Sequence, residues 1–142
     1  MEHIDVVVVG AGISGIGAAY NLKTRCPNKS YTILEGRSNL GGTWDLFKYP
    51  GVRSDSDMHT MGFKFKPWRS PKTIADAPSI LSYLNETVDE FDLRKKIQFN
   101  KKVIGAKWSS LEALWNLQVE DQSNKTVKEM TCNILYLCGG YY

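Results

Sequence analysis

The chain opens with an apolar run, Ile4–Val9, that leads directly into the glycine-rich turn Gly10-Ala11-Gly12-Ile13-Ser14-Gly15 and then into a run of small residues. The apolar run is typical of a buried parallel strand, and a helix is expected from Ile13 to Thr24. Gly10 allows a sharp turn, Gly12 lets the backbone approach a pyrophosphate, and Gly15 lets the helix lie against the strand. The sequence therefore predicts a strand, turn and helix whose helix N-terminus binds phosphate.

A second predicted strand, Tyr31–Leu34, ends in Glu35, which lies 20 residues after Gly15. An acid at this place accepts hydrogen bonds from the two ribose hydroxyls of an adenosine and repels a 2′-phosphate. The pattern therefore favours FAD or NAD over NADP at this first site. The alternatives are glycines that serve only the turn and a glutamate that is solvated at the end of a strand.

Composition limits the classes of protein that fit. With 142 residues and 42% hydrophobic content, the chain is long enough for one core. The 18 Lys and Arg exceed the 15 Asp and Glu by three but are spread along the chain, which is not typical of nucleic-acid binding. Cys26, Cys132 and Cys138 have no metal-site spacing and are odd in number, so we expect neither a metal site nor disulfides. A reducing cytoplasm is the expected location, and no apolar stretch reaches transmembrane length.

The segment between residues 36 and 78 has no sustained helical or strand period and is rich in Gly, Pro, Ser and Asp. It contains Gly41–Trp44, then Tyr49–Asp57, and then a group of aromatic residues between 63 and 68. Segments of this length without regular structure are uncommon in compact domains unless they serve a ligand. We therefore expect this segment and its rings to pack on a cofactor.

Regular patterns return in the second half of the chain. Asp76 begins a predicted helix with one apolar face, and four predicted strands follow it. These strands are Lys102–Trp108, Trp115–Glu120, Thr126–Cys132 and Ile134–Cys138. The first three are expected to form a small antiparallel meander, and the fourth to join the parallel sheet. The predicted fold class is α/β, a Rossmann-like three-layer domain of a parallel sheet, helices and the meander, incomplete at the C-terminus.

In combination, these motifs resemble the N-terminal FAD-binding segment of the class B flavoprotein monooxygenases, the flavin-containing and Baeyer–Villiger type, and most closely their ethionamide monooxygenase branch. The resemblance rests on Gly10–Gly15 with Glu35, on Gly41–Trp44, and on the sequence Tyr-Pro-Gly-Val-Arg-Ser-Asp-Ser-Asp at 49–57. It covers essentially the whole chain. It implies that residues 1–142 are the N-terminal part of an FAD-binding Rossmann-like domain and that the NADPH-binding domain is absent from them.

The resemblance also implies roles for individual residues. Ser14 lies beside the pyrophosphate in such proteins, Glu35 binds the ribose, and Thr43–Leu46 surrounds the ribityl and flavin side. Val103 matches a position whose backbone meets the adenine. The complete set of implied cofactor-binding residues is Gly10, Gly12, Ile13, Ser14, Gly15, Glu35, Gly42, Thr43, Trp44, Asp45, Leu46, Arg53, Ser54, Asp55 and Val103.

Asp55 is the one implied catalytic residue, in a supporting role. In the family this aspartate lies next to the flavin and orients an arginine that is not in this chain. Arg53, Ser54 and Asp55 match a stretch that also touches NADP. For Asp55 the alternative is a turn cap, and for Trp44 it is a core ring that closes the loop.

The implied activity is an FAD-, NADPH- and O2-dependent monooxygenation, in which a C4a-peroxyflavin oxidises a small-molecule ketone or sulfur compound. The isolated chain is expected to be inactive, because the arginine and the NADPH-binding domain are missing from it. The alternatives are a non-catalytic FAD- or NAD-binding module, a truncated remnant, and the NAD-binding domain of an ordinary dehydrogenase. A homo-oligomer is also compatible with the sequence, because a half-built sheet leaves an exposed edge.

Overall fold

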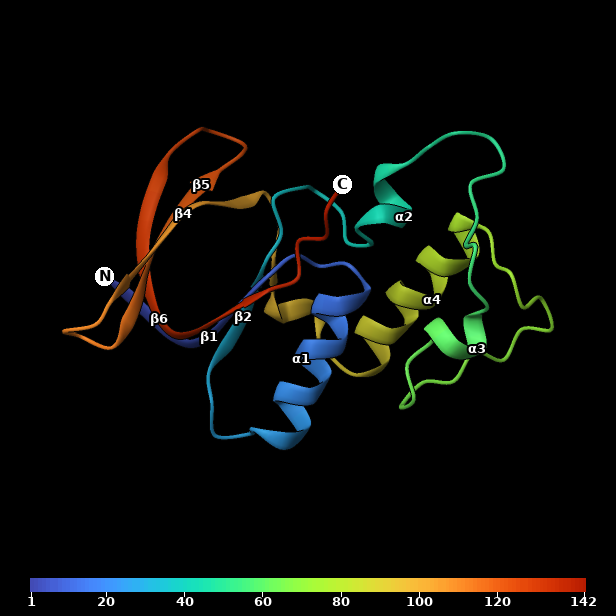
Figure 1. Ribbon diagram of the computed structural model, residues 1–142, viewed down its shortest axis with the longest axis horizontal. Coiled ribbons are helices and arrows are strands. Elements are labelled where there is room, and N and C mark those ends of the chain that lie inside the picture. The colour runs from blue at the N-terminus through green and yellow to red at the C-terminus, as the bar shows by residue number, and fades with distance from the viewer.

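Strand β1 (Glu2–Val9) lies inside a six-stranded sheet of order β3-β2-β1-β6-β5-β4 in the computed structural model, which describes residues 1–142 (Figure 1). It pairs in parallel with β2 (Tyr31–Leu34) on one side and with β6 (Val127–Leu137) on the other. The short strand β3 (Ile97–Gln98) extends the parallel part beyond β2. The two apolar runs of the N-terminal half are thus neighbouring parallel strands, as their patterns predict.

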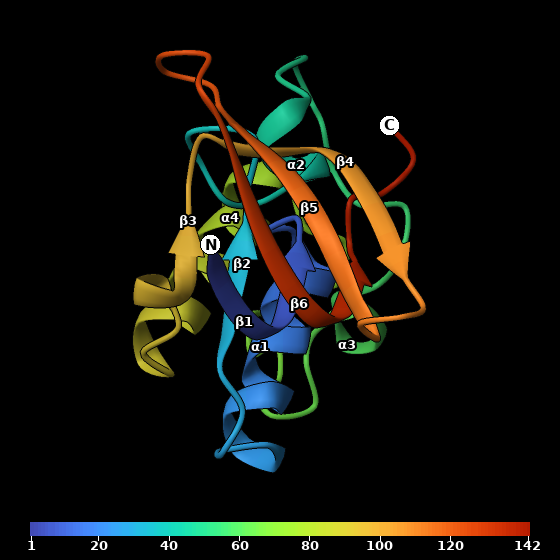
Figure 2. The ribbon, with the colours of Figure 1, turned by 90° about the vertical axis from the view of Figure 1, so that its left-hand side faces the viewer.

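The antiparallel meander consists of β4 (Lys101–Ser109), β5 (Leu114–Asp121) and the first part of β6. The expected separation of Thr126–Cys132 from Ile134–Cys138 is wrong, because β6 runs through both segments. Residues 127–132 pair with β5 and residues 130–137 pair with β1, so the two pairings overlap over three residues (Figure 2). One strand serves both parts because each of its two edges pairs with a different neighbour.

Two hydrophobic cores lie on opposite faces of the parallel strands. Val6 and Val8 belong to the core under the helices, whereas Val7, between them, belongs to the core under the meander. This alternation follows from the two-residue period of a strand. The meander core also contains Leu34, Leu117, Val119, Met130 and Cys132. Helices, parallel strands and meander form three layers, so the predicted Rossmann-like α/β fold is confirmed.

Two long helices cover one face of the sheet. Helix α1 (Ile13–Arg25) follows the glycine turn and ends one residue beyond the predicted end. Helix α4 (Ala77–Glu90) begins where predicted, because the Asp76 carboxylate accepts a hydrogen bond of 2.9 Å from the backbone N–H of Ser79. Hydrogen bonds from Ser79 and from Lys72 hold the pKa of the Asp76 carboxyl well below its usual range. The acid therefore keeps its charge and caps the helix throughout the neutral range.

The long middle segment contains two single-turn helices, α2 (Thr43–Leu46) and α3 (Met58–Met61), and a 3-10 helix, η1 (Arg94–Lys96), follows α4. The expectation that the aromatic residues of this segment pack on a cofactor is wrong for the rings between residues 63 and 68. The ring of Phe65 stacks on Tyr20 of α1 at 3.5 Å between centroids, and Phe63 stacks on Tyr83 of α4 at 5.9 Å. These rings extend the core under the helices instead.

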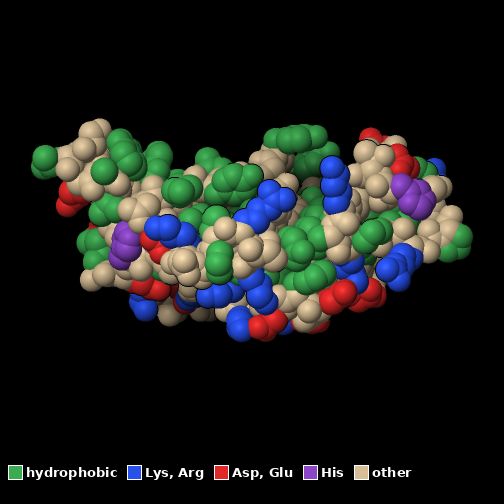
Figure 3. All heavy atoms as spheres, turned by 90° about the horizontal axis from the view of Figure 1, so that it is seen from below, with side chains coloured by type: hydrophobic (Ala, Val, Ile, Leu, Met, Phe, Trp, Pro, Cys, Tyr) green, Lys and Arg blue, Asp and Glu red, His purple; other side chains and the backbone are tan.

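One face of the molecule carries both signs of charge in mixture (Figure 3). On the face seen in Figure 3, Lys and Arg side chains are dispersed among acidic and apolar ones. The helices of the structure are all too short or too polar to cross a membrane.

The core under the helices predicts a strong contrast between two leucines. Replacing Leu84, which is fully buried in α4, with alanine should lower the free energy of unfolding by about 2–5 kcal/mol, because a cavity is left. The same change at Leu111, which is 97% exposed, should cost less than about 0.5 kcal/mol. Urea unfolding of both variants checks this, and equal losses would contradict the described core.

Candidate functional site

A cavity of about 400 Å³ opens where the glycine turn leaves β1, at the carboxyl ends of β1 and β2. Ligands of open α/β sheets bind at this edge. Its walls come from the glycine turn, the end of β2, the loop into α2, the start of β4 and the end of the chain. Ten of the predicted cofactor-binding residues line it: Gly10, Gly12, Ile13, Ser14, Glu35, Gly42, Thr43, Trp44, Leu46 and Val103.

Two glycines of the turn are required by close backbone approach. A Cβ atom on Gly15 would lie 1.8 Å from the carbonyl oxygen of Gly10, so α1 can rest on the end of β1 only with glycine there. Gly10 has a φ of 105°, and a Cβ on it would lie 2.5 Å from the carbonyl oxygen of Cys138. Both positions therefore shape the turn, and Gly10 also lines the cavity.

Gly12 and Gly42 place two stretches of bare backbone next to each other on the cavity wall. A Cβ on Gly42, whose φ is 55°, would lie 3.2 Å from the Cα of Gly12. The loops are joined by a hydrogen bond of 2.9 Å from the N–H of Gly41 to the carbonyl of Ala11. Because Gly12 is the N-cap of α1 and no side chain caps the helix, its first amide groups remain free for an anion.

Glu35 stands on the wall of the cavity and is only 8% exposed. Its Oε2 accepts a hydrogen bond of 2.8 Å from the N–H of Ala11, and its Oε1 accepts one of 2.9 Å from the N–H of Arg37. These two bonds fix the carboxylate in one orientation. Because a carboxylate has about four acceptor sites, each oxygen can still accept a hydroxyl hydrogen bond from a ligand.

Three cations that the sequence reasoning did not select also line the cavity: Arg37, Lys101 and Lys102. The Arg37 guanidinium binds Asp45, and Lys101 pairs with Asp121. These two cations are thus neutralised by acids outside the lining, and Lys102, which forms no ion pair, is the cation that can meet an anionic ligand. Lys101 and Lys102 stand at the start of β4, just after β3. Pairing of β3 with β2, which is far away in the sequence, brings them to the cavity. The sequence signal that could have identified Arg37 as a cavity residue is its place two residues after Glu35.

Five predicted residues lie outside the lining of the cavity. Gly15 is beneath the turn, and the buried carboxylate of Asp45 binds Arg37 and Lys48. The hydroxyl of Ser54 is buried and donates a hydrogen bond of 2.8 Å to the carbonyl of Ser56. The other two, Arg53 and Asp55, are exposed on the neighbouring loop.

Asp55 acts through its charge on one residue of the cavity lining, Tyr142. The pKa of Tyr142, which lines the cavity, is raised mainly by its hydrogen bond with Tyr141, and the charge of Asp55 adds to the effect. The thiol of Cys138, also in the lining, has its pKa raised by burial. It therefore stays protonated at neutral pH, which does not suit a nucleophile.

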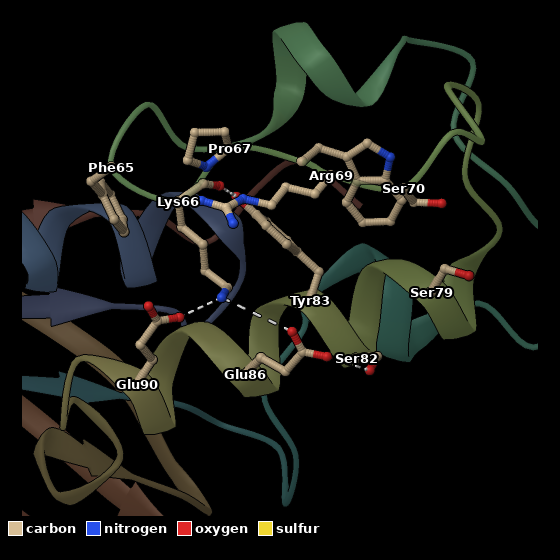
Figure 4. Close-up of a pocket in the computed structure, with 11 residues that line it drawn as sticks. Phe65, Lys66, Pro67, Arg69, Ser70, Ser79, Ser82, Tyr83, Glu86 and Glu90 are labelled. Carbon is tan, nitrogen blue, oxygen red and sulfur yellow. Dashed lines mark hydrogen bonds and ion pairs between the residues drawn. The ribbon is translucent and has the colours of Figure 1, made fainter.

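A second cavity, of about 500 Å³, lies between residues 65–70 and helix α4 (Figure 4). Its most enclosed cation, Lys66, points between Glu86 and Glu90 and forms ion pairs with both. The hydroxyl of Tyr83 donates a hydrogen bond of 2.5 Å to the carbonyl of Lys66. Because these groups are already paired with one another, the second cavity offers a ligand fewer free polar groups than the cavity at the glycine turn does.

The contact between α1 and β1 predicts a difference between two glycines of the site. Gly15→Ala should lower the free energy of unfolding by about 1–3 kcal/mol or more, because the new methyl group meets the Gly10 carbonyl. Gly139→Ala is the matched control, since a Cβ there meets no atom within 4 Å. Thermal unfolding followed by circular dichroism measures both, and a Gly15 variant as stable as the control would contradict the packing.

Comparison with known proteins agrees with this geometry. A family model described as an NAD(P)-binding Rossmann-like domain matches residues 8–72. The chain is 57% identical over 141 residues to the FAD-containing monooxygenase EthA of Mycolicibacterium smegmatis, and 50% identical over 141 residues to the probable FAD-binding monooxygenase AlmA of Acinetobacter baylyi. Each alignment covers 99% of this chain and 28% of the relative, so the chain spans little more than a quarter of these proteins.

Solved structures show the same likeness. An oxidised steroid monooxygenase bound to NADP matches with a TM-score of 0.86 and 30% identity, over 97% of this chain and 26% of its own. An open cyclohexanone monooxygenase matches with a TM-score of 0.87 and 28% identity, over 99% of this chain and 27% of its own. The resemblance seen in the sequence is confirmed: over nearly its whole length, the chain is similar to one part of FAD-containing monooxygenases.

Proposed function

We propose that this chain binds FAD in the cavity beside the glycine turn, as the FAD-binding segment of an FAD- and NADPH-dependent monooxygenase. The observation that carries the proposal is the bare backbone of Gly12 and Gly42 at the uncapped start of α1, with the oriented carboxylate of Glu35 on the same cavity wall. Relatives named for FAD support it, and so does the match to a structure called OTEMO in complex with FAD and NADP. The residues at the site fit a dinucleotide. The free amide groups at the start of α1, the anion cradle, can hold a pyrophosphate, and the Glu35 carboxylate can accept hydrogen bonds from ribose hydroxyls.

Each part of the cavity has a proposed role toward the cofactor. The amide groups after Gly12 hold the pyrophosphate, Glu35 accepts hydrogen bonds from the adenosine ribose, and the backbone at Val103 meets the adenine. Thr43 and Trp44, at the start of α2, lie toward the ribityl and flavin side. Asp55, on the exposed neighbouring loop, keeps its proposed supporting role beside the flavin.

The proposed reaction needs parts beyond these residues. Bound FAD would supply oxygen-transfer chemistry, with NADPH as the reductant and O2 as the oxidant, toward a ketone or a sulfur compound. The contribution of residues 1–142 is to hold the adenosine diphosphate part of the cofactor and to orient its flavin end. The NADPH site and the principal arginine would come from another segment.

A titration with FAD tests the proposed site. Glu35→Gln should weaken FAD binding by about 10- to 100-fold, because a hydrogen bond to a charged group is worth about 1.5–3 kcal/mol. Quenching of flavin fluorescence gives the dissociation constants, and far-UV circular dichroism verifies the fold. Glu112→Gln, at an exposed acid in the β4–β5 turn, is the matched control and should bind FAD like the parent chain. Equal affinity in both variants, or no FAD binding by the parent chain, would refute the proposal.

We also propose that residues 1–142 alone do not complete the reaction. The purified chain, loaded with FAD, should show no oxidation of NADPH above the rate of free FAD, because the chain holds only one part of the cofactor. Absorbance at 340 nm follows NADPH, and product analysis with a ketone and a thioether follows oxygen transfer. Product formation that requires the chain would overturn this part of the proposal.

A further inference from the structure

We infer that Arg37 is a positioning residue, which holds α2 against the nucleotide-binding turn and connects the ribose end of the site to its flavin end. The inference rests on the proposed function of the cavity. It concerns a residue that lies in the cavity lining and that the motifs of the sequence do not single out.

The guanidinium of Arg37 bonds to Gly42, at the start of α2, and to Asp45 within it. Its Nη2 donates to Oδ2 of Asp45 at 2.7 Å and to the carbonyl of the same residue at 3.2 Å. Its Nη1 donates to the carbonyl of Gly42, the N-cap of α2, at 3.4 Å. A helix of only four residues does not form alone, because nucleation costs more than a few hydrogen bonds return. The arginine supplies contacts that make this turn stable.

The partner of Arg37 is a buried acid. The side chain of Asp45 is 8% exposed, and its other oxygen, Oδ1, pairs at 3.4 Å with Lys48, a side chain that is largely in solvent. A buried carboxylate without a close cation is strongly unfavourable. Only the planar fork of an arginine can bind the carboxylate and two carbonyl groups together, so lysine would replace the charge but not the geometry.

The main chain of Arg37 acts on the ribose end. Its N–H holds Oε1 of Glu35 at 2.9 Å, and its carbonyl accepts a hydrogen bond of 2.9 Å from the N–H of Asn100, just before β4. A side-chain substitution leaves these backbone bonds in place. Loss of the side chain should therefore release α2 while the groups that face the adenosine stay where they are.

Two substitutions separate positioning from general stability. Arg37→Met keeps the length without the charge, Arg37→Lys keeps the charge without the fork, and Arg69→Met is the matched control at an exposed arginine of the second cavity. Calorimetry gives the dissociation constants of FAD and of ADP, which lacks the flavin. For Arg37→Met we expect FAD to bind about 5- to 20-fold more weakly. The expected loss is moderate because the side chain is 40% exposed and its ion pair is partly screened. The dissociation constant of ADP should change less than about twofold. Arg37→Lys should recover part of the FAD affinity, and Arg69→Met should match the parent chain.

Hydrogen exchange of the chain without ligand provides a test that does not depend on FAD. The amides of Trp44, Asp45, Leu46 and Phe47 bond within the turn. In Arg37→Met they should exchange at least about tenfold faster, while the amides of α1 keep their rates.

The outcomes distinguish this inference from the proposed function. If the parent chain binds no FAD, the proposed function fails, and the exchange rates alone decide whether Arg37 holds α2. If the parent chain binds FAD, equal losses for FAD and ADP would overturn the positioning role. Exchange rates in the turn that Arg37→Met leaves unchanged would overturn it in either case.

Discussion

The close contact between Gly15 and the carbonyl of Gly10 is the constraint on which the site depends. It brings the start of α1 onto the end of β1 and turns the free amide groups of the helix toward the cavity. With any side chain at position 15, helix and strand would separate, and the cradle at Gly12 would open. The same contact positions Ala11, whose N–H holds Glu35 and whose carbonyl holds the loop before α2.

The sheet determines what surrounds this cradle. Because β6 pairs with β1 along one edge and with β5 along the other, the meander is a continuation of the parallel sheet. This brings the start of β4, with its two lysines, to the same edge as the end of β2. The resulting cavity has a wall of backbone amides, an oriented acid and surrounding cations, which together suit a molecule with both phosphates and a ribose.

Much of this arrangement could be predicted from local patterns. The glycine spacing, the acid at position 35 and the cap at Asp76 depend on short-range geometry, so the sequence specifies them directly. The continuity of β6 could not be predicted, because it depends on partners remote in the chain. The rings between residues 63 and 68 were assigned to the wrong neighbour, since aromatic content does not reveal which surface a ring covers. Arg37 was missed because its role appears only when Gly42 and Asp45 are folded around it.

The most direct test of the cradle is a two-dimensional 1H–15N NMR titration of the labelled chain with FAD. If FAD binds at the glycine turn, the amide signals of Gly12 to Gly15, of Gly42 to Trp44 and of Lys101 to Val103 shift together and saturate at one affinity. Signals from the second cavity, around Lys66 and Arg69, should remain in place. Shifts confined to that second cavity, or no saturable shifts at the glycine turn, would contradict FAD binding at this site.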